Sequence, residues 1–448
     1  MQRTHCKIHI TFFIIRNTIS NLFKKTVTVG VVKGCSALVG FILIVVVSRA
    51  LGAIEAGYFL LGYTLVFALS GFFRLGLDNV ILRYMGAEGL SVTSQEFFNK
   101  GLLWICMFVL PFTCLVALST GFIAEELLSK PDFAPVLSWF ILALPPITLC
   151  SLIAIAFQGL NKTITAILFQ NLGLSSIFIF SYFIIENFSS PSSKAVLLAV
   201  IFSFSSILVF LIGVYVWFSQ TNASFHVAKF RDKNLWAISS NLWAASTMIM
   251  LVQWSGILVA SVFVTSEELA YLTAAQRTAM LAGFVLIVVN MMVAPRYARL
   301  WKQNKIMEME RLAIVSTRAM ICLVLPVVLF VVIFPEWIMG LFGEGFEEGA
   351  PLLIIIILGQ FVSVMTGSVG YLLTMSGHEK DFRRVTIIAG SLTMLLAFLL
   401  TMEWGGIGAS YATAIGLSVQ NLLAVYMVNK RLGFNTLNFF KKAKYGKV

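Results

Sequence analysis

The sequence predicts an all-α integral membrane protein with about 12 transmembrane helices, arranged as two six-helix lobes. Three observations lead to this prediction. Apolar residues make up 59% of the chain and charged residues 12%, whereas soluble domains are roughly half apolar and a quarter charged. The apolar residues gather in runs of about 20, the length at which a helix crosses a bilayer. Finally, one stretch of the first half returns in the second half.

The repeated stretch consists of a short polar elbow, an apolar span and an Arg-Tyr pair. It covers residues 48–84 and, 213 residues later, residues 261–297. The identical residues include Glu55 and Glu268, Tyr58 and Tyr271, Arg83 and Arg296, and Tyr84 and Tyr297. A second, shorter echo aligns residues 157–163 with 375–381, which pairs Gly159 with Gly377. Internal repeats are typical of secondary transporters, so we expect two halves of one membrane protein.

Each apolar run is expected to form one spanning helix, because about 20 residues at about 1.5 Å each cross the hydrocarbon core. The loops between the runs are short, and none is large enough for a soluble domain. The expected spans are 27–47, 58–80, 101–120, 136–157, 164–185, 195–218, 237–263, 271–294, 313–334, 351–375, 386–403 and 408–428.

These spans divide the chain into lobes and connecting segments. The division predicts a cytoplasmic N-terminal tail at 1–26, an N-lobe at 27–218, a cytoplasmic linker at 219–236, a C-lobe at 237–428 and a basic cytoplasmic tail at 429–448. The first tail has a short apolar run with basic flanks but no small-residue cleavage site, so we expect a surface helix there and no signal peptide.

The basic residues lie mainly on one side of the predicted membrane. That side, which includes both termini, holds 26 of the 32 Lys and Arg residues, and the opposite side holds four. Cytoplasmic loops are the ones enriched in Lys and Arg, so both termini are expected in the cytoplasm. Two halves of six spans then enter the membrane from the same side, which relates them by a pseudo-two-fold axis along the membrane normal.

Composition also excludes several classes of function. The net charge of +12 comes from short clusters between apolar runs, a distribution that favours membrane orientation over nucleic-acid binding. The six cysteines lie mostly inside apolar runs without a CxxC spacing, so they predict neither a disulfide frame nor a metal site. No nucleophile–base pair or phosphate-cradling loop occurs in the sequence. We therefore expect no catalytic residues, no metal and no cofactor.

Five segments carry a resemblance to a known family. They are SRALGAIEAGYF (48–59), RLGLDNVILRY (74–84), QGLNKT (158–163), TSEELAYLTAAQR (265–277) and GGIGASYATAIGLSVQNLLAVYMVNKRLG (405–433). Over about residues 20–435 the sequence resembles the polysaccharide transporter family, the Wzx-type O-antigen flippases. That family belongs to the superfamily of multidrug, oligosaccharidyl-lipid and polysaccharide exporters. One departure stands out, because Ser255 follows Trp254 where family members often carry an acidic residue.

The resemblance implies a two-lobed carrier in the bacterial inner membrane. Such a carrier moves undecaprenyl-diphosphate-linked oligosaccharide, an O-antigen or capsule repeat unit, to the periplasmic leaflet by alternating access. Its expected partners are the lipid-linked oligosaccharide, membrane lipids, a polysaccharide polymerase and a chain-length regulator. The coupling ion stays open between H⁺ and Na⁺, because no deep, isolated acid stands out among the spans.

Charged residues inside apolar spans are the candidates for the binding site. Lys33, Arg74 and Arg277 lie within or near the ends of spans, and each costs about 2.5–3.5 kcal/mol at a helix centre. Asp78 lies one turn after Arg74 and is the expected ion-pair partner. A diphosphate suits such cations, because Arg binds its oxygens bidentately and Lys supplies a point charge. The alternative is that Lys33 snorkels and Arg277 anchors the outer interface.

Neutral polar residues form a second group of candidates. Gln253 with Trp254 in the seventh span offers amide groups and a flat aromatic face for a sugar, and Asn290 lies in the eighth span. The alternative for each is an interhelical hydrogen bond worth about 0.6 kcal/mol. Gly30 and Gly34 have the GxxxG spacing of helix packing. Glu55 and Glu268 are expected to be helix caps or markers of span ends at the two elbows.

Two other functions compete with a flippase. A multidrug/cation antiporter of the same superfamily would need buried carboxylates for a cationic drug, whereas the deep charges here are basic. A membrane-embedded O-antigen polymerase or ligase would place catalytic Arg, His or Glu in a sizeable outer loop. The outer loops here are brief, so we expect no enzyme.

Overall fold

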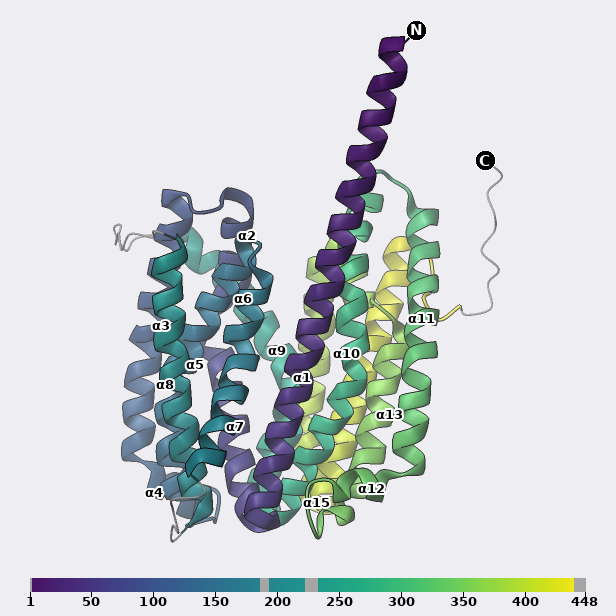
Figure 1. Ribbon diagram of the computed structural model, residues 1–448. Helices are drawn as coiled ribbons and strands as arrows, with labels where there is room; N and C mark the ends of the chain where they lie inside the picture. Colours follow the sequence, from purple (N-terminus) through teal and green to yellow (C-terminus); the bar gives the residue numbers. More distant parts are fainter. Residues whose placement is uncertain (1, 186–192, 222–232, 439–448) are drawn as a thin grey trace.

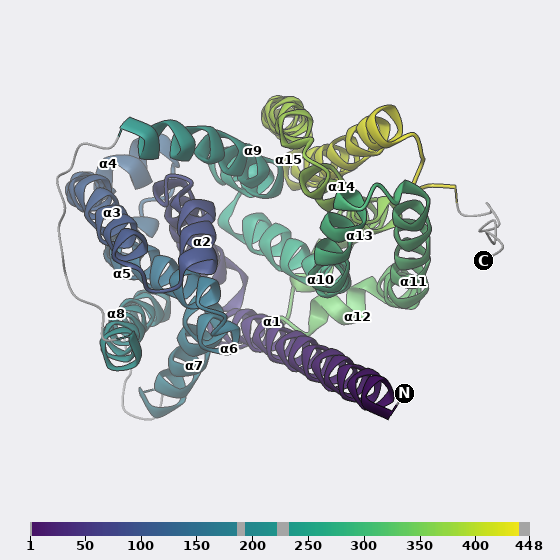
Figure 2. The same cartoon turned by 90° about the horizontal axis from the view of Figure 1, so that it is seen from above.

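The computed structural model describes residues 2–185, 193–221 and 233–438, and in these ranges every regular element is a helix (Figure 1). The helices form two groups that lie side by side, as predicted. Seen from above, α9 follows the boundary between the groups, with α2 on one side and α15 on the other (Figure 2). The predicted linker lies mostly outside the described residues, and so does the second half of the basic tail.

The first group holds the second half of α1 and the helices up to α8. Their bounds are α1 (Gln2–Phe73), α2 (Leu77–Glu88), α3 (Val92–Leu118), α4 (Thr120–Phe122), the π-helix η1 (Ile123–Leu127), α5 (Phe133–Gly159), α6 (Thr163–Ile167), the π-helix η2 (Leu168–Leu172), α7 (Gly173–Ile185) and α8 (Lys194–Thr221). Helix α1 begins at Gln2 and shows no break at residue 26, so the predicted tail continues directly into the first span.

The second group holds the remaining helices. Their bounds are α9 (Lys233–Phe263), α10 (Ser266–Lys302), α11 (Ile306–Ile333), α12 (Pro335–Gly340), the 3₁₀-helix η4 (Phe346–Gly349), α13 (Ala350–Thr366), α14 (Val369–Met375) and α15 (Glu379–Leu432). Small residues let α9 and α15 approach closely: a Cβ atom on Gly256 would lie 3.0 Å from the Ala409 carbonyl oxygen.

The prediction of about 12 spans is confirmed, although two helices each contain two of them. Ten helices of the described chain are long and apolar enough to cross a membrane. One is the 46-residue part of α1 from Thr28, and another is the 54-residue α15. Each exceeds twice the roughly 20 residues that one crossing needs. Gly52 (φ 72°) and Gly405 (φ 56°) interrupt the two helices, because their left-handed backbone reverses the chain between spans.

Aromatic packing fixes the second half of α1 in the first lobe. The Phe59 ring lies 4.9 Å from the Phe140 ring and 6.1 Å from the Phe202 ring, and all three side chains are fully buried. Edge-to-face pairs of this kind add about 0.5–1.5 kcal/mol each beyond burial. This core holds the second span in register with α5 and α8.

The first half of α1 packs on the other lobe. A Cβ atom on Gly30 would lie 3.6 Å from Val288, and one on Gly34 would lie 3.5 Å from Phe284, both on α10. The GxxxG pair therefore serves packing, as expected. Figure 1 shows this half of α1 running beside α10. The division into lobes at residues 27–218 and 237–428 remains a proposal, with α1 in contact with both groups.

The elbow glutamates of the two copies of the repeat have the same structural role. Glu55 Oε2 accepts a hydrogen bond of 2.9 Å from the backbone N–H of Ala195, at the start of α8. Glu268 Oε1 accepts one of 2.7 Å from the N–H of Gly406, just after the bend in α15. In each lobe the elbow glutamate therefore caps the start of the lobe's last span, as the capping expectation required.

The second echo is real, but its alignment shifts by two residues. After α5 the Lys162 N–H donates to the Phe157 carbonyl, and after α14 the His378 N–H donates to the Leu373 carbonyl. The left-handed residue in these two turns is Asn161 and Gly377, respectively. Asn161 therefore corresponds to Gly377, and Gly159 does not. Sequence identity of the glycines misled the alignment, because Asn also adopts this conformation at helix C-termini.

Candidate functional site

Arg277 lies between the two lobes. It is 11 residues after the start of α10 at Ser266, or about 16 Å along the helix. Its guanidinium carbon is 5.0 Å from the ring centre of Tyr63 on α1 and 4.6 Å from that of Trp254 on α9. These cation–π contacts are worth about 2 kcal/mol each when water is excluded. The two aromatic rings enclose the cation, which favours a site between the lobes over the alternative of an interfacial anchor.

The Arg277 guanidinium has no anionic partner in the part of the chain that the structure describes. Its Nε and Nη2 atoms are buried and donate no hydrogen bond. None of the ion pairs formed by the described Asp and Glu residues includes it. An unpaired buried charge costs several kcal/mol, which aromatic faces offset only in part. The arrangement is therefore suited to an anion that arrives from outside the chain.

Polar groups of α9 and α10 surround this arginine. The Gln276 side-chain amide donates to the backbone carbonyl of Gln253, and Gln253 Nε2 lies 3.7 Å from the sulfur of Met280. Gln276 Oε1 is buried without a partner. The predicted neighbours Gln253 and Trp254 thus lie beside Arg277, whereas Tyr63 and Gln276 were missed. Tyr63 could not be found by spacing, because it reaches the site from the other lobe.

Arg74 and Asp78 form an ion pair elsewhere in the interface. Arg74 Nη1 is 2.6 Å from Asp78 Oδ2, and both side chains are about one-quarter exposed. Yet Arg74 Nε and Asp78 Oδ1 are buried without hydrogen-bond partners. Arg74 is 11 residues from Tyr63 in sequence, or about 16 Å if the chain were helical throughout. This pair is therefore separate from the Arg277 group.

The second span is not continuous, contrary to the expectation for 58–80. Helix α1 ends at Phe73 and α2 begins at Leu77, so Arg74, Leu75 and Gly76 form a break. Leu75 (φ 53°) and Gly76 (φ 72°) are left-handed. Glycine in an apolar span was the available signal, since interrupted segments mark binding sites in transporters.

Lys33 and Asn290 lie apart from Arg277. Lys33 is half-buried on the first half of α1, next to Gly34, which faces α10. Asn290 is buried on α10, its Oδ1 atom has no partner, and it is 13 residues from Arg277, or about 20 Å along the helix. The predicted residues thus follow the interface along its length and do not form one cluster.

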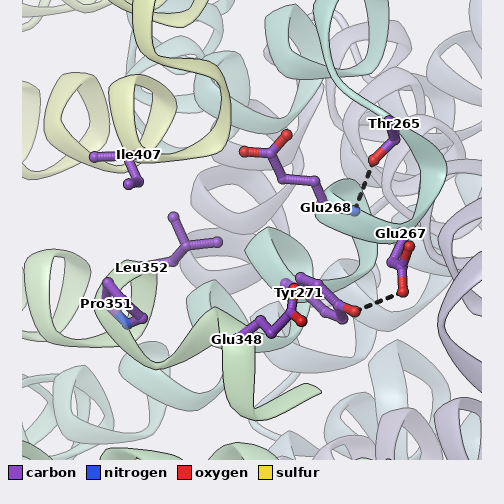
Figure 3. A pocket seen from close by; sticks show the side chains of 8 residues that line it. All are labelled: Thr265, Glu267, Glu268, Tyr271, Glu348, Pro351, Leu352 and Ile407. Atoms are coloured by element: carbon purple, nitrogen blue, oxygen red, sulfur yellow. Dashed lines mark hydrogen bonds between the residues drawn. The ribbon is translucent and has the colours of Figure 1, made fainter. Parts of the chain in front are cut away.

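A pocket of about 300 Å³ opens where α10 begins, and Figure 3 shows the side chains around it. Two of its three carboxylates, those of Glu267 and Glu268, accept hydrogen bonds within the protein. Besides the cap at Gly406, Glu267 accepts a hydrogen bond of 2.8 Å from the Tyr271 hydroxyl. The lining residues are Thr265, Glu267, Glu268, Tyr271, Glu348, Pro351, Leu352 and Ile407. These contacts explain the acidic residues as parts of helix ends.

Two family models match the chain. The model of the polysaccharide biosynthesis protein family matches residues 22–301, and the MatE model matches residues 244–400. A curated relative, the probable low-salt glycan biosynthesis flippase Agl15 of Haloferax volcanii, is 23% identical over 228 residues. That match covers 50% of this chain and 48% of the relative, so it spans about half the length of each.

Solved structures with the same fold are transporters. The lipid II flippase MurJ in an inward closed conformation has a TM-score of 0.71 at 14% identity, covering 90% of this chain and 87% of its own. An inward-facing multidrug resistance transporter of the MATE family has a TM-score of 0.69 at 14% identity, covering 90% and 98%. A transporter of the same superfamily from Pyrococcus furiosus has a TM-score of 0.68 at 13% identity, covering 92% and 96%. At these identities the likeness shows the fold alone.

Proposed function

Since this multi-pass membrane protein belongs to the polysaccharide biosynthesis protein family, we propose that it is a flippase for lipid-linked oligosaccharide. Its substrate is an undecaprenyl-diphosphate-linked repeat unit of O-antigen or capsule. The two lobes expose the site alternately to the two leaflets of a bacterial inner membrane, with both termini in the cytoplasm. The glycan flippase relative and the fold shared with MurJ support this class of transport.

The observation that carries the proposal is the buried, unpaired guanidinium of Arg277 between Tyr63 and Trp254. A diphosphate supplies the missing negative charge, and Arg binds phosphate oxygens through two parallel hydrogen bonds. The flat faces of Tyr63 and Trp254 suit the apolar face of a sugar next to the diphosphate. Lys33 offers further positive charge towards the cytoplasmic half and Arg74 does so from its ion pair with Asp78, with Gln253 and Asn290 as neutral donors.

A multidrug/cation antiporter is the second candidate, supported by the MatE match over the C-lobe. The charge at the interface argues against it. A cationic drug placed between Tyr63 and Trp254 would meet a guanidinium, and Arg277 has no carboxylate partner among the described residues. Bringing two like charges together in a desolvated site is unfavourable. We propose no enzymatic step, because the family and the related structures are those of carriers.

The first prediction tests this site. Full-length protein in liposomes is given a fluorescent undecaprenyl-diphosphate oligosaccharide, and flipping is followed by quenching in the outer leaflet. We expect Arg277→Gln to slow flipping at least about tenfold, because it removes one charge-assisted pair worth about 1.5–3 kcal/mol. Arg277→Lys should retain part of the rate. Arg299→Gln is the matched control, since Arg299 is exposed on the same helix.

The competing outcomes are distinct. If the Arg277→Gln variant flipped the lipid at the wild-type rate, the guanidinium would not be part of an anion-binding site. Efflux of cationic dyes by the wild-type protein, with no flipping of the diphosphate lipid, would favour the antiporter.

A further inference from the structure

The break in the second span is held by the opposite lobe. The Trp243 indole N–H donates a hydrogen bond of 2.9 Å to the Phe72 carbonyl, and the Ser239 hydroxyl donates to the Leu75 carbonyl. Both donors lie on α9, whereas the carbonyls belong to Phe72, near the end of α1, and to Leu75, in the break that follows. Ending a helix inside a membrane leaves carbonyls without partners, which is tolerated only when other groups bind them. The Ser239 hydroxyl supplies such a partner to the Leu75 carbonyl, and the Trp243 indole adds a second donor to the Phe72 carbonyl, which also accepts a hydrogen bond of 3.2 Å from the Leu75 N–H.

The backbones also approach closely at the break. A Cβ atom on Gly76 would lie 2.5 Å from the Trp243 backbone nitrogen, and one on Gly71 would lie 2.7 Å from the sulfur of Met250. The Phe72 and Trp243 rings pack edge to face with their centres 5.0 Å apart. This contact, from Gly71 to Gly76 and from Ser239 to Met250, is called the inner contact below.

A second set of bonds joins the lobes at the other end of α9. Lys130, which is buried, donates hydrogen bonds of 2.7 Å to the Ser261 carbonyl and 2.8 Å to the Val264 carbonyl. A Cβ atom on Gly57 would lie 1.8 Å from the Ser266 carbonyl oxygen. Both ends of α9 are therefore tied to the N-lobe in this structure. A carrier that works by alternating access must release the two ends in turn.

We propose that the inner contact is the cytoplasmic gate of the transport cycle, with Ser239 and Trp243 as its latch. The inference rests on the proposed carrier function. Two features suit a gate. The latch consists of two neutral hydrogen bonds, each a modest contribution that thermal motion can break and remake. The break itself supplies a short, non-helical segment that absorbs backbone rotation, as hinges do.

The gate is tested first by locking it. In a functional variant whose six native cysteines are replaced by serine, Gly71→Cys and Met250→Cys are combined. A Cβ atom at position 71 would lie 2.7 Å from the sulfur of Met250, and removal of that side chain makes room for the new thiols, so we expect the two cysteines to come within reach of a disulfide. We expect mild oxidation to link the pair and abolish flipping, and a reductant to restore it. Each single variant should be indifferent to oxidation.

The gate is tested second by loosening it, with a readout that needs no substrate. Spin labels at Glu88→Cys and Lys302→Cys, both exposed at the predicted cytoplasmic ends of the lobes, report the distance between them. Ser239→Ala with Trp243→Phe removes both donors and keeps the aromatic ring. We expect the ratio of long-distance to short-distance populations to rise about fivefold or more. Ser418→Ala with Trp404→Phe is the control, because neither side chain touches the inner contact.

The outcomes separate this inference from the proposed function. A cross-linked protein that flips at the wild-type rate would overturn the gate, and so would unchanged spin-label distances in the loosened variant. A loosened variant with longer distances, in a protein that flips no diphosphate lipid, would keep the gate and reject the substrate.

Discussion

Single residues at equivalent positions of the two lobes carry the clearest sign of the repeat. Glu55 and Glu268 occupy the same place in the repeated sequence, and each accepts a backbone N–H at the start of the last span of its lobe. The identical residues in the two copies were too few to demonstrate the repeat by themselves. The two glutamates therefore have the same structural role, since each joins the start of the second span of its lobe to the start of the sixth.

Removing either carboxylate should destabilise the protein. We expect Glu55→Ala and Glu268→Ala each to lower the free energy of unfolding by about 0.5–2 kcal/mol, the range for loss of a helix cap. Thermal unfolding in detergent measures the effect. Glu344→Ala is the control, because Glu344 is an exposed acid at the same end of the protein. If the two cap variants unfolded like Glu344→Ala, the capping role would be wrong.

The residues of the candidate site were only partly readable from sequence. Arg277, Gln253 and Trp254 stood out because charge and amide groups are costly in an apolar helix. Tyr63 did not, because an aromatic residue in a span is ordinary and its contact with Arg277 crosses the lobes. Lys33 and Arg74 were grouped with Arg277 by charge alone, and charge gives no information about how far along the lobe interface a side chain lies.

At the scale of elements, hydropathy located all the spans but not their interruptions. The bends at Gly52 and Gly405 and the break after Phe73 depend on left-handed backbone, and only some glycines of the chain adopt it. Helix α9 shows that tertiary contacts determine how the end of a helix is stabilised. Its last carbonyls accept hydrogen bonds from Lys130, a residue of a distant loop whose role sequence spacing did not reveal.

Lys130 should control the outer end of α9. We expect Lys130→Met to favour separation of the lobes there, because two charge-assisted hydrogen bonds worth about 1.5–3 kcal/mol each are lost. Spin labels at Glu126→Cys and Glu344→Cys, both exposed, would report more of the longer distance. Lys194→Met changes an exposed lysine and should leave the distances alone. Identical distance distributions in the Lys130→Met and Lys194→Met variants would show that Lys130 does not hold the two lobes together.

At the scale of the whole molecule, the charge distribution predicts how the chain is oriented in the membrane. The side that carries both termini holds 26 of the 32 basic residues, and basic loops resist translocation. In this predicted orientation the inner contact of α9 faces the cytoplasm and the Lys130 end faces the periplasm. The first half of α1 bridges the two lobes, so any opening must carry this helix with one lobe or bend it at Gly52.

This orientation is testable without any transport assay. Single cysteines are placed at Glu344, in an exposed loop, and at Lys302, the exposed last residue of α10; the two positions lie at opposite ends of α10 and α11 in the structure. A membrane-impermeant maleimide should label Glu344→Cys in intact spheroplasts and Lys302→Cys only after the membrane is permeabilised. The reason is that Lys302 lies among the Arg and Lys residues that end α10, whereas Glu344 lies in an acidic loop. The reverse pattern would exchange the roles of the two ends of α9, and the inner contact would then be a periplasmic gate.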